Sequence, residues 1–151
     1  MYAGEIRRRQ SATEARLKRE LPGWWAHSIG TYDRRTLYSA GPEGFGTAII
    51  TDQSSPDSLI EAVRAFEAHL DHHLDDARHR LADAKNRANA GAAGGYARDQ
   101  ANVLAGRVEA LEKLWALREA TVAKARVEAV SAMRDVLEHV PDPVPDAGDD
   151  G

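Results

Sequence analysis

The chain has 151 residues and a net charge of −4, a length that allows one domain with its own core, and its abundance of Arg, Ala and Gly is typical of GC-rich bacterial genomes. It has no cysteine, which excludes disulfides, thiolate catalysis and cysteine-based zinc sites, and no apolar run of the ~20 residues that a membrane span requires. The N-terminus reaches Arg7–Arg9 without the apolar stretch of a secretory signal, so we expect a cytoplasmic protein that begins at Met1 and has no membrane partner.

The first predicted element is a basic helix from Ala3 to Leu21, which Pro22 and Gly23 end. Its basic residues are Arg7, Arg8, Arg9, Arg16, Lys18 and Arg19, and Arg34 and Arg35 follow in a predicted turn. The guanidinium group of Arg binds phosphate well. A nucleic-acid-binding face would therefore use these residues together with aromatic side chains that stack on bases. The alternative is that the basic side chains only solvate a short helix.

A segment of different amino-acid composition follows the basic helix. Trp24–Ile29, Thr36–Ala40 and Phe45–Thr51 are rich in aromatic and β-branched residues, and turn-like residues separate them. We predict three antiparallel strands in a meander. Strand alternation places Trp24 and Trp25 on opposite faces of this sheet. One of the two indoles therefore either packs under a helix or belongs to a partner-binding patch.

The rest of the chain is predicted to form two long helices. Ser55 caps the first, which covers residues 57 to about 90. The glycine-rich break at 91–95 is the tip of an antiparallel hairpin, and the second helix covers residues 96–140. Three prolines begin an acidic tail at 141–151, which we expect to be disordered.

The predicted fold class is α+β, with an N-terminal helix and a three-stranded antiparallel meander in residues 1–56 and a coiled-coil-like hairpin in residues 57–140. At 1.5 Å per residue the second long helix overshoots the first by about ten residues. The overshoot carries four apolar side chains, Val130, Met133, Leu137 and Val140. We expect this end to pack on residues 1–56, so that the whole chain forms one body.

The predicted order of one helix, three strands and one helix resembles that of double-stranded-RNA-binding domains. The resemblance implies a nucleic-acid partner. Those domains place a basic cluster at the start of their second helix, where this chain has Ser55, Pro56, Asp57 and Ser58, with Glu61 following. The likeness therefore covers the order of the elements and not this binding cluster.

A run rich in histidine and aspartate, residues 69–79, lies in the first long helix. His72, Asp76 and His79 share one helical face, and histidines with carboxylates at such spacing can hold Zn²⁺. The run does not match the His-Glu-x-x-His pattern of zinc proteases. A solvated or pH-sensitive helix face would account for the same residues.

Phosphate-binding loops, nucleophile elbows and dinucleotide fingerprints do not occur in the sequence, so we expect no enzyme and no cofactor. The favoured function is protein–protein interaction, as a homo-oligomer, adaptor or regulator in a bacterial cytoplasm or a mobile element. The predicted interface consists of large apolar side chains, Trp24, Trp25, Leu104, Leu111 and Trp115. Nucleic-acid binding through the basic N-terminal helix is the alternative, and metal binding comes third.

Overall fold

The computed structural model describes residues 2–91 and 94–139. The chain divides into two units, Met1–Leu117 (unit 1) and Arg118–Gly151 (unit 2). The predicted tail at 141–151, Val140 and part of the predicted hairpin tip lie outside the described residues. None of the described helices is long and apolar enough to cross a bilayer.

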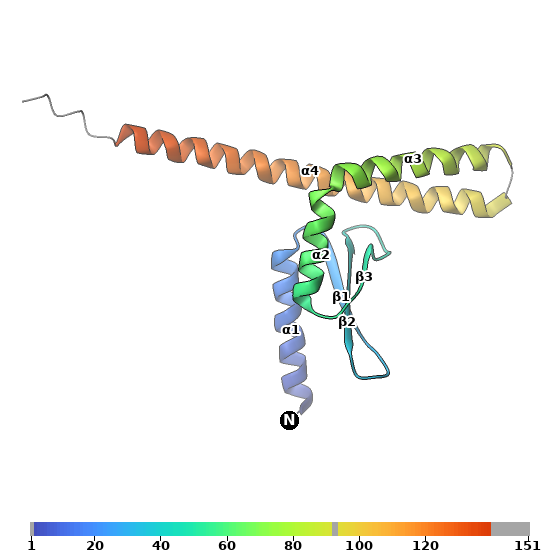
Figure 1. Ribbon diagram of the computed structural model, residues 1–151, viewed down its shortest axis with the longest axis horizontal. Coiled ribbons are helices and arrows are strands. Elements are labelled where there is room, and N and C mark those ends of the chain that lie inside the picture. The colour runs from blue at the N-terminus through green and yellow to red at the C-terminus, as the bar shows by residue number, and fades with distance from the viewer. Residues whose placement is uncertain (1, 92–93, 140–151) are drawn as a thin grey trace, which may run out of the picture. The chain divides into compact units, whose positions relative to one another are not determined.

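The elements follow in the order α1 (Tyr2–Glu20), β1 (Trp24–Gly30), β2 (Thr36–Pro42), β3 (Ile50–Gln53), α2 (Pro56–Ala68), α3 (Leu70–Asn89) and α4 (Gly94–Glu138) (Figure 1). The strands form one antiparallel sheet in the order β1-β2-β3. In unit 1, α3 and the first part of α4 run side by side as a hairpin (Figure 1). The predicted α+β fold class is confirmed.

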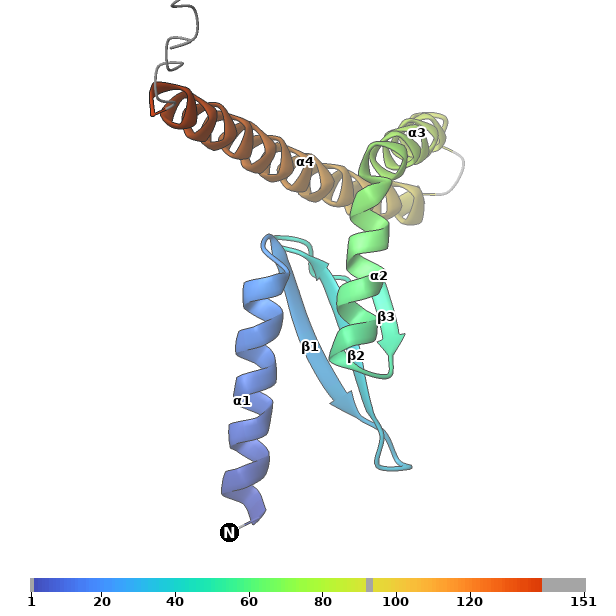
Figure 2. The ribbon, with the colours of Figure 1, turned by 60° about the vertical axis from the view of Figure 1, so that its left-hand side comes forward.

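Both helices that flank the sheet cover the same face of it (Figure 2). The N-terminal helix contacts β1, α2 contacts β2 and β3, and the two helices contact each other. Trp24 lies on this covered face and is only 3% exposed, whereas the neighbouring Trp25 lies on the opposite face and is half-buried. Because successive side chains of a strand alternate, the two tryptophans separate as the sequence predicts.

A single core connects the sheet with the hairpin inside unit 1. It consists of Leu17, Leu21, Trp24, Ala40, Leu59, Ile60, Val63, Phe66, Leu70, Leu74, Ala77, Val108, Leu111 and Leu114. The last three residues belong to the first part of α4, so this helix shares a core with α1 and the sheet through residues 108–114. The predicted packing of residues 130–140 on residues 1–56 concerns unit 2, and it stays a prediction.

The predicted helix over residues 57–90 is two helices, because the chain bends at His69. Ser55 caps α2 as expected, since its side chain accepts a hydrogen bond of 3.0 Å from the backbone N–H of Ser58. His69 has φ −119° and ψ 30°, outside the helical region, and its N–H donates to the carbonyl of Phe66 at 3.1 Å. The bend lets α2 pack on the sheet while α3 packs along α4, which one straight helix cannot do.

The third predicted strand, 45–51, is also wrong at its start. Residues 43–49 form a loop, and β3 begins at Ile50. The loop packs against Trp25, whose indole N–H donates to the carbonyl of Phe45 at 2.7 Å. Gly41 allows this approach, because a Cβ there would lie 2.6 Å from Cζ2 of Trp25 and 2.9 Å from the carbonyl oxygen of Thr47.

Candidate functional site

Two of the five predicted interface residues lie in the core. Leu111 has no exposed surface, and Trp24 packs the edge of its ring against Phe66 with centroids 5.6 Å apart. The indole N–H of Trp24 donates to Oε1 of Glu67 at 2.6 Å. Neither side chain is available to a partner on this fold, so the interface role predicted for them is corrected to a structural one.

Trp25, Leu104 and Trp115 remain at or near the surface. Trp25 stacks on His27 with centroids 5.4 Å apart, on the sheet face opposite to α1 and α2. Leu104 is half-buried between the arms of the hairpin, whereas Trp115 is 38% exposed on the flank of α4. Trp115 lines a shallow depression with Asp71, His72, Leu74, Asp75 and Arg78 of α3. These three side chains lie at separate places, so they do not make one patch.

The largest set of exposed apolar side chains in unit 2 lies on the C-terminal part of α4. Its members are Val122, Val127, Val130, Met133, Val136 and Leu137, and their exposed fractions run from 40% to 70%. Residues 130, 133 and 137 are spaced by three and four, and Val122 and Val136 lie two heptads apart, so five of the six share one side of the helix. Val127 lies at its border. We call these six residues the α4 stripe.

Arg118, Glu119 and Arg126 lie on the same side of α4 as the stripe. Glu119 and Arg126 are seven residues apart, which is about two turns of helix. These two residues make no ion pair within residues 2–91 and 94–139, whereas Lys124 and Glu128 on the other side pair with each other at 3.9 Å.

The structure does not bring the candidate metal ligands of the histidine-rich run together. Nδ1 of His79 lies 2.8 Å from the carbonyl oxygen of Asp75, and Asp76 pairs with Arg80 at 3.0 Å. Among the described residues, no three His, Cys, Asp or Glu side chains are grouped as metal ligands. His72, Asp76 and His79 are therefore not brought together around one position.

His73 contacts the core through its ring. Its ring stacks flat on Phe66, with centroids 4.0 Å apart and an interplanar angle of 5°. Burial lowers the pKa of His73, and the nearby His72, His69 and Arg107 lower it further, against an opposing effect of Asp76. His73 lies seven residues after Phe66, which is about two helical turns, and this spacing was the available signal in the sequence.

Some of the predicted basic residues form ion pairs with nearby carboxylates. Arg9 pairs with Glu5 at 3.0 Å, and Arg35 pairs with Asp33 at 3.1 Å. The hydrogen bond to Asp57 and the charge of that carboxylate raise the pKa of Arg16, which also pairs with Glu20 at 3.7 Å. Arg16 thereby joins the end of α1 to the start of α2.

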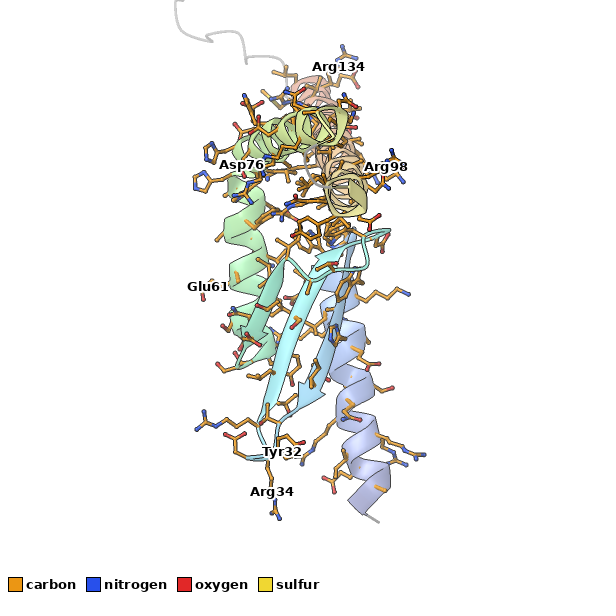
Figure 3. All side chains as sticks on the ribbon, turned by 90° about the vertical axis from the view of Figure 1, so that its right-hand side faces the viewer. Tyr32, Arg34, Glu61, Asp76, Arg98 and Arg134 are labelled. Atoms are coloured by element: carbon orange, nitrogen blue, oxygen red, sulfur yellow. The ribbon has the colours of Figure 1, made fainter. Side chains whose placement is uncertain are left out.

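The other predicted basic residues make no ion pair with any residue that the structure describes. They are Arg7, Arg8, Lys18, Arg19 and Arg34, and all five are exposed. Arg34 lies beside Tyr32 at the tip of the β1–β2 hairpin (Figure 3). Tyr32, which belongs to none of the predicted site residues, is 110% exposed. The signal available in the sequence was the position of Tyr32 in a predicted turn between two strands, where side chains are usually exposed.

The chain has no significant match among protein-family models, curated proteins or solved structures. The candidate surfaces therefore rest on the geometry described above.

Proposed function

We propose that this chain is a non-enzymatic interaction protein of the bacterial cytoplasm that pairs with a second copy of itself through the α4 stripe. The observation that carries the proposal is the exposure of the stripe, since its six large apolar side chains are 40% to 70% exposed along one stretch of helix. Most of the stability of helices in proteins comes from the packing of an apolar face rather than from helix propensity. Covering the stripe would stabilise it, because each Val, Leu or Met side chain contributes ~1.5–3 kcal/mol when fully buried.

The length of the stripe supports a second copy as its cover. The same six residues on a second α4 helix offer an apolar surface of equal length, so pairing of two copies buries both stripes at once.

The test is the solution mass of the full chain at high micromolar concentration, measured by light scattering and sedimentation. We expect a dimer, with twice the 16.5 kDa of one chain. Val130→Glu places a charge in the stripe and should give monomers. The matched control is Ser131→Glu, which adds the same charge at the next residue, on the opposite side of α4, and should leave the dimer intact.

A monomeric wild type would overturn the proposal. If Val130→Glu then lowered the melting temperature of that monomer while Ser131→Glu did not, the stripe would be covered by the same chain. That result would support the predicted packing of residues 130–140 on the N-terminal part instead.

A further inference from the structure

The outward side of α1 carries cations but few anions. At 100° per residue, Arg8 lies half a turn away from the buried Leu17, and Arg19 points in nearly the same direction as Arg8. The residues between them on this side are small, Ser11, Ala12 and Ala15. This side of α1 is thus a smooth surface with a guanidinium near each end.

Arg7 and Lys18 widen this cationic side. Both are exposed and border the line from Arg8 to Arg19. Of the three acidic residues in α1, Glu5 and Glu20 pair with arginines on the other flank, and Glu14 borders the surface next to Lys18. We call Arg7, Arg8, Lys18 and Arg19 the α1 cationic face. It spans about 18 Å of helix, which matches about five phosphates along one strand of a duplex.

The tip of the β1–β2 hairpin adds an aromatic ring at one end of this face. Tyr32 and Arg34 project from the tip at the same end of unit 1 as the start of α1 (Figure 3). The turn is held by two backbone hydrogen bonds, from Thr31 N–H to the Arg35 carbonyl at 2.9 Å and from Arg34 N–H to the Thr31 carbonyl at 3.1 Å. The ring of Tyr32 is therefore presented on an ordered turn rather than on a loose loop.

We propose that the α1 cationic face and the tip residues Tyr32 and Arg34 together bind the phosphate backbone of nucleic acid. Exposed Arg and Lys side chains on a helix contact successive phosphates, and an exposed Tyr stacks on bases or sugars. A helix that lies on a membrane surface needs an exposed apolar side below its cations. The sides of α1 that point outward hold only small and charged residues between Arg7 and Arg19, which favours nucleic acid over an anionic bilayer.

The test is fluorescence anisotropy of the full chain with four labelled probes of mixed sequence: duplex RNA, duplex DNA and the two corresponding single strands. Five phosphate contacts, four from the α1 cationic face and one from Arg34, predict a slope of about −4.5 in log affinity against log salt for duplex DNA, and hence a loss of about 500-fold between about 50 and 200 mM salt. The four probes distinguish a duplex from a single strand as the source of the phosphates. Binding to any of them with such a slope supports the proposal.

The decisive variant is Arg8→Gln/Arg19→Gln, because these side chains have no ion-pair partner in the described part of the chain. It should reduce the salt slope by about two and weaken binding about tenfold or more, with an unchanged melting temperature. Tyr32→Ala should weaken binding without changing the slope.

The matched control is Arg78→Gln/Arg80→Gln, which removes the same charge from two exposed arginines of α3 that are already paired with Glu112 and Asp76. The control should bind like the wild type. Equal losses in the two double variants would show that net charge alone governs binding and would overturn the proposal. Binding to phosphatidylserine vesicles without binding to any nucleic-acid probe would overturn it as well. These readouts do not depend on whether α4 pairs with a second copy.

Discussion

Trp24 of β1 meets Phe66 of α2 edge to face, with ring centroids 5.6 Å apart and an interplanar angle of 88°. His73 of α3 stacks on the same phenyl ring at 4.0 Å. Phe66 therefore joins three elements, the sheet and the two helices on either side of the bend at His69. Aromatic pairs of this geometry contribute stability beyond their buried area.

Phe66→Ala should lower the free energy of unfolding by ~3–5 kcal/mol, since it leaves a cavity and removes both ring contacts. Urea unfolding followed by tryptophan emission measures this change. Phe45→Ala is a useful comparison, because Phe45 is only half-buried and contacts Trp25 through its backbone carbonyl. A similar loss for both variants would contradict the central position assigned to Phe66.

The pKa of His73 predicts how stability depends on pH. Its pKa is lowered in the folded state, so the unfolded chain takes up the proton first as the pH falls. The contribution of neutral His73 to the free energy of unfolding is fully present above the unfolded pKa of about 6.5 and is lost as the pH falls below it. We expect a lower urea midpoint at about pH 5.5 than at about pH 7.5.

His73→Phe keeps a ring on Phe66 and removes the titrating group, so it should reduce the difference between the two pH values. His79→Gln, on the exposed side of α3, is the control and should keep the wild-type difference. If His73→Phe also kept that difference, another group would be responsible for it.

Gly41→Ala should destabilise the sheet, because the added Cβ would lie 2.6 Å from the ring of Trp25 and 2.9 Å from the carbonyl oxygen of Thr47. Overpacking of this kind typically costs ~1–3 kcal/mol. At Gly46, five residues further on, nothing lies within 4 Å of the new Cβ. Gly46→Ala should thus stay within about 0.5 kcal/mol of the wild type in thermal unfolding. Equal effects of the two substitutions would argue against close packing at Gly41.

Ser55→Ala should cost about 1 kcal/mol, because it removes the acceptor for the backbone N–H of Ser58 at the start of α2. Ser54→Ala changes the preceding exposed residue in the same way without touching the cap. Denaturant titration of both variants and the wild type measures the difference. A neutral Ser55→Ala would mean that water replaces the cap at no cost.

Local patterns in the sequence were sufficient for the element types and several boundaries. Alternation separated Trp24 from Trp25, because a strand turns successive side chains to opposite faces whatever it packs against. The cap at Ser55 was predictable because its hydrogen bond joins two residues that are only three positions apart in the sequence. The glycine-rich break likewise predicted where α3 and α4 separate.

The tertiary structure decided which of these elements bend, which side chains are buried and which charges stay unpaired. The bend at His69 has no Pro or Gly to mark it, and it arises because α2 and α3 pack on different surfaces. Arg16 pairs with Asp57, which lies 41 residues away, and no local spacing rule predicts this contact. Leu111 and Val130 each belong to an apolar stripe with spacings of three and four, yet one is fully buried and the other is 52% exposed. Periodicity defines a face of a helix, whereas only the packing of distant segments determines what covers that face.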